Sequence, residues 1–207
     1  MAYNKYPDTT ILVFCKAPIA GQVKTRLIPH VNAQQAADIH RQLSHRILSL
    51  LSDSQLCPIE LWCAPDTQHL FFFDCSGKYG VPLHKQSGHD LGKKMNDAIS
   101  TALEKSSRVL LVGCDCPSLT IADFDDAIKA LDQHDVVLAP AEDGGYVMIG
   151  MKKTYPQLFE NIIWGKSDVL AITRQRIKQL NLNSVDIAKQ WDVDEIVDLK
   201  RYQDKHI

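Results

Sequence analysis

Short apolar segments alternate with amphipathic helical patterns along the whole chain. Runs rich in β-forming residues occupy positions 10–15, 59–64, 108–113, 135–140 and 145–150. Strands that alternate with helices and are apolar at nearly every position are typical of a mainly parallel sheet buried on both faces. At 207 residues, the chain therefore predicts an α/β fold in one domain, residues 1–207.

The longest helical pattern begins at Asn32. Its apolar positions recur three and four residues apart, at Ala36, Ile39, Leu43, Ile47 and Leu50. The same pattern carries His40 and His45, and no histidine of the chain pairs with another at a metal-like spacing. We expect both side chains at the surface of this helix.

Three further helices are predicted. One covers residues 91–103, and a second begins at Thr120, where Asp123 stands at the spacing of a capping box. Ser167 is expected to cap the last helix. The apolar patch at 70–73 fits either a helix or a strand, so the sequence leaves its structure open.

Composition excludes several classes of function. The formal net charge is −2 and the pI about 6.4, which gives no electrostatic case for binding nucleic acid. No apolar run is long enough to cross a bilayer, and the first ten residues lack the apolar core of a secretory signal. We therefore expect no membrane association and a cytoplasmic location.

The six cysteines are expected to be reduced in that compartment. Cys114 and Cys116 enclose a single residue, whereas zinc knuckles usually place two to four residues between their cysteines. The sequence contains no C-x-x-C pair. These thiols are therefore predicted to be small buried hydrophobic groups that play no part in the chemistry.

Ligands of parallel α/β sheets bind where the strands end at their carboxyl termini. The first such loop, "KAPIAGQVKTRL" (16–27), contains Lys16, Lys24 and Arg26 together with Pro18 and Gly21. Lysine supplies a point charge and arginine a planar fork, a combination that suits a pyrophosphate. The loop has neither P-loop nor G-x-G-x-x-G spacing. A solvated basic loop is the alternative.

An aspartate follows the third β-rich run. The Gly-x-Asp of "GCDCP" places the carboxylate of Asp115 at the edge of the sheet, where an oxygen ligand for Mg²⁺ or Mn²⁺ is useful. A turn or a helix cap would explain Asp115 equally well. A second carboxylate could come from Asp192 or Asp194, because an i, i+2 pair on an extended segment points to one side.

Two more loops carry candidate groups. In "AEDGGY" (141–146), Asp143 is placed to act as a base, and Gly144 and Gly145 let the backbone pass close to a ligand. D-G and G-G are also strong hairpin signals, so this loop is expected to be a turn as well. In "QSGHDLG" (86–92), Asp90 is available to accept hydrogen bonds from a base or a ribose.

Six ordered segments resemble motifs of the DUF2064 family: "FCKAPIAGQVKTRL", "GHDLGKKM", "LLVGCDCPSLT", "VVLAPAEDGGYVMIGM", "IIWGKSDVLAITRQR" and "WDVDEIVDLKR". Members of that family are described as GT-A-type glycosyltransferases, some of them associated with arsenosugar biosynthesis. The resemblance implies a Rossmann-like three-layer α/β/α sandwich, similar to nucleotide-diphospho-sugar transferases, that binds a nucleotide diphosphate and a divalent ion. It covers about residues 10 to 200.

The resemblance also implies roles for particular residues. Asp115 matches the family's metal aspartate. The basic loop is similar to the nucleotide-binding loop of 2-phospholactate and molybdopterin guanylyltransferases, in which two aspartates near the C-terminus join the metal, and these correspond to Asp192 and Asp194. One departure affects the acceptor: the family's usual Trp-Ser-Thr is Trp164-Gly165-Lys166 in this chain.

The sequence thus predicts a metal-dependent transferase with a nucleotide-activated donor, most simply a glycosyltransferase that uses a nucleotide sugar and a small-molecule acceptor. Its nucleotide-binding residues would be Lys16, Pro18, Gly21, Lys24, Arg26 and Asp90. Its acceptor-binding residues would be Asp143, Gly144, Gly145, Tyr146 and Trp164. Two alternatives remain open: a nucleotidyltransferase that uses a nucleoside triphosphate and releases pyrophosphate, and a non-catalytic nucleotide-sensing module.

Overall fold

A seven-stranded sheet forms the centre of the computed structural model, which describes residues 4–204. The strand order is β3-β2-β1-β4-β6-β5-β7. The strands are β1 (Thr9–Lys16), β2 (Ile59–Ala64), β3 (Leu83–Lys85), β4 (Arg108–Gly113), β5 (Val136–Pro140), β6 (Tyr146–Met151) and β7 (Ser184–Asp186). Only β6 runs antiparallel to its neighbours, β4 and β5, within the described chain. The predicted mostly parallel sheet is confirmed, as is the hairpin of β5 and β6.

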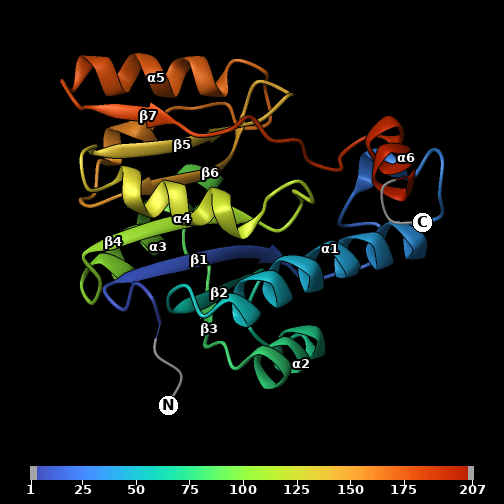
Figure 1. The fold of residues 1–207 in the computed structure, drawn as a ribbon. Coiled ribbons are helices and arrows are strands. Elements are labelled where there is room, and N and C mark those ends of the chain that lie inside the picture. Colours follow the sequence, from blue (N-terminus) through green and yellow to red (C-terminus); the bar gives the residue numbers. More distant parts are fainter. Residues whose placement is uncertain (1–3, 205–207) are drawn as a thin grey trace.

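Helices cover both faces of this sheet, which makes the fold a three-layer sandwich (Figure 1). The helices are α1 (Ala33–Ser54), α2 (Leu70–Tyr79), α3 (Leu91–Leu103), α4 (Ile121–Ala130), α5 (Val169–Gln179) and α6 (Ile196–Asp204). One hydrophobic core lies between the sheet and α1, α2 and α4. A second core lies on the opposite face, under α3 and α5.

Most helix starts follow the predicted capping chemistry, with one exception. The capping box of Thr120 and Asp123 begins α4, and Asn32 forms a further box with Gln35 at the start of α1. The prediction for Ser167 is wrong, because α5 has Asp168 at its N-cap position and neither residue caps with its side chain. Ser167 instead presents its backbone carbonyl to the turn at Gly144.

The undecided patch at 70–73 is the first turn of α2, capped by the side chain of His69. Phe71 and Phe72 are buried, whereas Leu70 and Phe73 face solvent. Burial of one side only is typical of an amphipathic helix. The helix α6 and the three-residue strands β3 and β7 were not predicted, because segments this short carry too few residues for a period.

The expected surface position of His40 is wrong. His40 is only 3% exposed, and His45 is half-buried against Tyr79. The buried stripe of α1 runs through Ala36, His40, Leu43, Ser44 and Ile47. His40 therefore lies on the face of α1 that packs toward the sheet.

A third, smaller core lies beyond the carboxyl end of β1. It joins the 3₁₀ turn η1 (Thr25–Leu27) to the N-terminal half of α1, to α6 and to the segment before α6. Its buried members are Leu27, Ala36, Leu43, Trp191, Val193 and Leu199. Figure 1 shows α6 beside the blue segment that follows β1. No helix within residues 4–204 combines the length and the apolar character needed to traverse a bilayer.

Candidate functional site

Loops from β1, β4 and β5 converge with residues 190–194 at one edge of the sheet. The backbone N–H of Val193 donates to the Asp115 carbonyl at 3.0 Å, and the N–H of Gln190 donates to the Pro140 carbonyl at 2.8 Å. Ser118 Oγ also donates to Gln190 Oε1 at 2.7 Å. These bonds fix the C-terminal carboxylates next to the β4 loop, although the two segments are far apart in sequence.

The first cavity of the site has a volume of about 440 Å³. Its walls include three cations of the predicted basic loop, Lys16, Lys24 and Arg26, and two of the predicted carboxylates, Asp115 and Asp194. The structure thus brings together five predicted site residues from three distant segments. Of the three cations, Lys24 is buried, whereas Lys16 and Arg26 are exposed to solvent at the mouth of the cavity.

Lys24 and Asp115 are the central pair of this cavity. Lys24 has a left-handed backbone, with φ of 49°, and its side chain is 3% exposed. Its Nζ lies 2.9 Å from Asp115 Oδ2. Burial alone would lower the pKa of Lys24, but Asp115 more than offsets this and raises it. Lys24 is therefore a fully charged ammonium in the wall of the cavity.

Asp115 has a second cationic neighbour. His40 Nδ1 lies 3.4 Å from Asp115 Oδ1, and His40 Nε2 donates to the Lys16 carbonyl at 2.9 Å. Burial would lower the pKa of His40, but Cys114, Asp115 and the Lys16 carbonyl raise it to about 9. Although burial would raise the pKa of Asp115, Lys24 and His40 hold it well below its usual range. Asp115 is ionised at every physiological pH.

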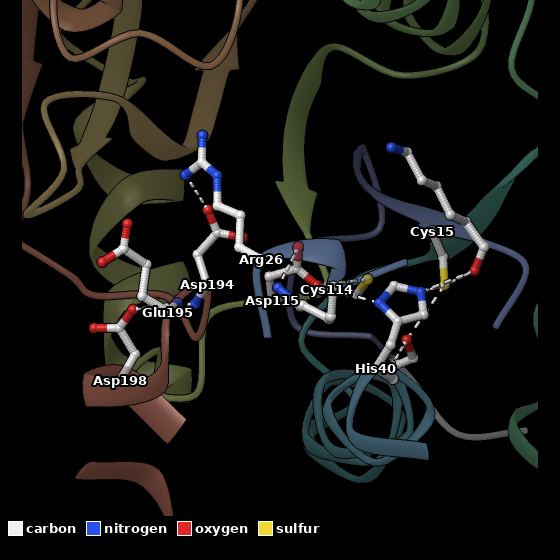
Figure 2. A network of polar contacts seen from close by, with 11 residues as sticks. Cys15, Arg26, His40, Cys114, Asp115, Asp194, Glu195 and Asp198 are labelled. Carbon is white, nitrogen blue, oxygen red and sulfur yellow. Dashed lines mark hydrogen bonds and ion pairs between the residues drawn. The ribbon is translucent and has the colours of Figure 1, made fainter. Parts of the chain in front are cut away.

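A second cavity of about 250 Å³ adjoins the first. Arg26 and Asp194 line both cavities, and Arg26 Nη1 donates to Asp194 Oδ2 at 2.5 Å. Figure 2 shows this pair on one side of Asp115 and His40 on the other. Of its nine lining residues, six are acidic: Glu142, Asp143, Asp192, Asp194, Glu195 and Asp198. The second cavity is therefore strongly electronegative.

Residues 191–194 alternate as the i, i+2 spacing predicts. Trp191 and Val193 are 5% and 0% exposed, whereas Asp192 and Asp194 are half-buried and line the second cavity together. Burial, followed by the charge of Asp143, raises the pKa of Asp192 to about 6. The raised pKa of Asp192 thus comes first from burial of the carboxyl group and second from the negative charge of Asp143.

Three carboxylates have the donor chemistry of a hard divalent cation, although among the described residues their oxygens do not all lie within 4.8 Å of one another. Asp115, Asp192 and Asp194 supply carboxylate oxygens, the ligands that Mg²⁺ and Mn²⁺ prefer. Six carboxylates and a single arginine line the second cavity, which leaves negative charge there that a cation would offset. These three residues could hold the ion.

The β5–β6 turn places Asp143 in the second cavity, with its Oδ1 accepting the Gly145 N–H at 2.9 Å. Gly144 has a φ of 90°, and a Cβ at this position would lie 2.1 Å from the Ser167 carbonyl oxygen. The backbone that passes close to Gly144 is thus that of Ser167, whereas the sequence led us to expect a ligand there. Tyr146 and Trp164 pack against each other, with ring centroids 6.4 Å apart, and line neither cavity.

Three predicted nucleotide-binding residues lie outside the first cavity. Asp90 caps α3 by accepting the Lys93 N–H at 2.7 Å, and it lines a separate cavity of about 270 Å³. Pro18 is buried in the basic loop, and Gly21 forms a turn with a φ of 82°. In this structure these residues shape the loops that position Lys24 and Leu91.

Sequence reasoning missed His40 as a neighbour of Asp115. The signal was present, because Ala36, His40, Leu43 and Ile47 follow the same 4-3-4 spacing as a core stripe. Sequence reasoning also missed Arg201, whose guanidinium pairs with Glu142 at 2.9 Å and lies over the Trp191 ring at 4.2 Å. Nothing in its local sequence distinguishes Arg201 from Lys200, the other cation of α6.

Solved structures of transferases share this fold. A candidate nucleotide-diphospho-sugar transferase from Desulfovibrio desulfuricans G20 is 29% identical, with a TM-score of 0.86 over 95% of this chain and 86% of that chain. A 4-diphosphocytidyl-2C-methyl-D-erythritol synthase from Anaerococcus prevotii DSM 20548 is 10% identical, with a TM-score of 0.64 over 97% of this chain and 98% of that chain. The inositol-1-phosphate CTP transferase of T. maritima is 12% identical, with a TM-score of 0.60 over 97% of this chain and 96% of that chain. None of the curated proteins matches this chain in sequence.

The fold is that of the nucleotide-diphospho-sugar transferases. Residues 47–166 match the family described as "Uncharacterized protein conserved in bacteria (DUF2064)", and the chain belongs to that family. The resemblance that the sequence motifs indicated is thereby confirmed.

Proposed function

We propose that this protein is a metal-dependent transferase that moves a glycosyl group from a nucleotide sugar to a small-molecule acceptor. The observation that carries the proposal is the contrast between two adjoining cavities. Lys16, Lys24 and Arg26 line the first, and six carboxylates line the second. Arg26 and Asp194 stand at the junction. A diphosphate fits the first cavity by charge, and a neutral polyhydroxyl molecule fits the second.

The donor diphosphate would lie in the first cavity. Lys24 and Arg26 would donate to its oxygens, and Lys16 would add positive charge at the cavity edge. Asp115, with Asp192 or Asp194, would hold Mg²⁺ or Mn²⁺, which neutralises charge on the diphosphate. The fold that this chain shares with an inositol-1-phosphate CTP transferase and with a 4-diphosphocytidyl-2C-methyl-D-erythritol synthase supports a nucleotide as its substrate.

The transfer step follows from the position of Asp143 in the second cavity. The acceptor hydroxyl gives its proton to the Asp143 carboxylate while its oxygen bonds to the anomeric carbon of the donor sugar. The bond from that carbon to the diphosphate oxygen breaks, and the nucleoside diphosphate leaves with the electron pair. Arg26 and Lys24 stabilise its developing charge, a contact whose loss commonly costs about 10²–10³-fold in rate.

A nucleotidyltransferase is the second candidate. Its acceptor would carry a phosphate that attacks the α-phosphate of a nucleoside triphosphate. Among the nine lining residues of the second cavity, Arg26 is the single Lys or Arg, and it is paired with Asp194. The phosphate of such an acceptor would be repelled by the six carboxylates of the second cavity. This lining therefore favours a neutral acceptor. A sensing module, the third candidate, has no use for Asp143 beside an acidic acceptor cavity.

The experiment measures thermal shifts of the full chain with nucleoside diphosphates, triphosphates and nucleotide sugars, each with and without Mn²⁺. A ligand present at 100 times its dissociation constant should add about 2.7 kcal/mol of stability. The best ligand is then incubated with a panel of sugars, polyols and their phosphate esters, and the released product is identified. Released nucleoside diphosphate supports glycosyl transfer, whereas released pyrophosphate establishes the nucleotidyltransferase.

The variant Asp115→Asn should lose the Mn²⁺-dependent part of the nucleotide shift. Asp53→Asn is the matched control, because Asp53 is exposed near the end of α1 and lines neither cavity. If Asp115→Asn is too unstable to measure, Asp194→Asn tests the same metal site. Unchanged Mn²⁺-dependent binding in both variants refutes the assignment, and nucleotide binding without turnover on any acceptor supports the sensing module.

A further inference from the structure

Two cysteines and a histidine from different elements meet beside Asp115. Cys15 belongs to β1, Cys114 directly follows β4, and His40 belongs to α1. A ligand atom from each lies within 4.8 Å of the others, and the three residues are 1%, 5% and 3% exposed. Figure 2 shows the His40 ring between Cys15 and Asp115. The sequence offered no sign of this cluster, because 99 positions separate the two cysteines along the chain.

The sheet register brings the two thiols to the same level. Strands β1 and β4 are parallel neighbours, with Phe14 opposite Gly113, so Cys15 and Cys114 are the next residues of the two chains. Cys116 does not join them, since its Sγ contacts Ser118 Oγ at 3.3 Å. The two thiols that lie together are therefore those of Cys15 and Cys114. Cys114 and Cys116, which are close in the sequence, do not form such a pair.

The orientation of His40 suits a metal ligand. The Nε2–H donates to the Lys16 carbonyl at 2.9 Å, and the other ring nitrogen, Nδ1, is buried without a hydrogen bond. Metal-binding histidines almost always donate their second N–H to a carbonyl or carboxylate, which fixes the ring. Here that support is already in place, and Nδ1 is the nitrogen directed toward Asp115.

Three ligand atoms lie close enough for one ion to reach them with small side-chain shifts. Sulfur, nitrogen and oxygen ligands of Zn²⁺ lie about 3.3–3.8 Å from one another in a tetrahedron. Asp115 Oδ1 lies 3.4 Å from His40 Nδ1 and 3.5 Å from Cys114 Sγ. Cys15 Sγ lies 3.8 Å from His40 Nε2, the nitrogen that donates to the Lys16 carbonyl, and one ligand atom each of Cys15, His40 and Cys114 lies within 4.8 Å of the others. Cys15, His40 and Cys114 also line the first cavity, which gives an ion a path to them.

We propose that Cys15, His40 and Cys114 bind a thiophilic divalent cation such as Zn²⁺, whose fourth coordination position faces the first cavity. Binding releases the two thiol protons and the Nδ1 proton to solvent. The two thiolates then balance the charge of the ion, and Lys24 remains the counter-ion of Asp115. The proposal does not depend on the transferase activity.

The test is a titration of the reduced full chain with Co²⁺, a spectroscopic substitute for Zn²⁺, in a phosphine reductant. We expect one equivalent to bind with a thiolate-to-cobalt charge-transfer band, and Zn²⁺ to displace it. Cys15→Ser and Cys114→Ser should each abolish the band and weaken binding by about 100-fold or more. The buried Cys57 and Cys75 lie outside the cluster, so Cys57→Ser and Cys75→Ser are the matched controls.

A cobalt spectrum without a sulfur band, or a band that persists in both Cys15→Ser and Cys114→Ser, overturns the proposal. Should those variants fail to fold, zinc-edge X-ray absorption on the unsubstituted protein gives the answer directly. Two sulfur neighbours at about 2.3 Å support the site, and a shell of oxygen alone refutes it.

Discussion

The Lys24 ammonium and the Asp115 carboxylate form an ion pair of 2.9 Å in which the cation is 3% exposed and the anion 42%. The lysine is thus part of the protein interior, and the aspartate faces the cavity. This asymmetry has a direct consequence for stability. A buried ammonium that loses its partner is far more costly than an exposed carboxylate that loses its partner.

Asp115→Asn should therefore destabilise the protein more than Lys24→Met. We expect a loss of about 2 kcal/mol for Asp115→Asn, below the 3–5 kcal/mol typical of a fully buried pair because Asp115 is partly solvated. The double variant should recover most of this loss, since it removes the unpaired charge. Urea unfolding of the four proteins without metal or nucleotide measures the coupling, and additive effects of the two substitutions would contradict it.

Asp192 should make stability depend on pH in the absence of metal. Burial and the charge of Asp143 raise its pKa from 3.8 to about 6. Between these two values the folded protein holds more protons than the unfolded chain, so the contribution of Asp192 to stability is lost as the pH rises. Asp192→Asn should thus be more stable than the unsubstituted protein at pH 8 without metal.

In the presence of Mn²⁺ the trend should reverse, because the ion binds the ionised carboxylate. Mn²⁺ affinity should rise from pH 5 to pH 7 in the unsubstituted protein and in the control Asp53→Asn, and should be nearly flat in Asp192→Asn. Thermal unfolding across this pH range with and without Mn²⁺ gives both results. An equal pH slope in Asp192→Asn would exclude Asp192 from the metal site.

Arg26→Gln should weaken binding of a nucleoside diphosphate by about tenfold, which corresponds to about 1.4 kcal/mol. Arg26 lines both cavities, and its pairing with Asp194 is exposed, so the stability change should stay within about 1 kcal/mol. Arg174→Gln is the matched control, since Arg174 pairs with Asp186 and lines neither cavity. Titration calorimetry measures the affinities. Equal affinities of the two variants would remove Arg26 from the donor site.

Gly144→Ala should destabilise the protein through a backbone clash as well as through its left-handed conformation. The added Cβ would lie 2.1 Å from the Ser167 carbonyl oxygen. Gly80→Ala is the control, because Gly80 also has a positive φ, of 65°, but open space around it. The control should cost about 1–2 kcal/mol and Gly144→Ala clearly more. Equal denaturant midpoints for Gly144→Ala and Gly80→Ala would show that the backbone around Gly144 shifts at little cost and relieves the clash.

The alternation of strands and helices was enough to predict the sheet and its two helical layers, because long apolar elements repeat their period several times. The helix α1 shows where this reasoning ends. Its apolar positions Ile39 and Leu50 are only half-buried, whereas His40 and Ser44 are buried. The polarity of His40 led to the prediction that it lies at the surface. Its burial is explained by its contacts with Cys15 of β1 and with Cys114 and Asp115, which follow β4.

The site was predictable in part for a similar reason. Charges that follow a strand, such as Lys24 and Asp115, lie where the topology of the sheet puts them. Asp90 is different, since capping of α3 already accounts for its carboxylate. The meeting of Cys15 with Cys114 depends on the pairing of β1 with β4, and no local pattern encodes which parallel strands become neighbours.

The third core links the basic loop to the C-terminal carboxylates. Leu27 follows Arg26 directly, Val193 lies between Asp192 and Asp194, and both are 0% exposed in one cluster. A change of side-chain volume in this cluster shifts cations and carboxylates relative to each other without altering any ligand. Natural variation at such positions can therefore retune affinity over generations while the chemistry of the site is inherited intact.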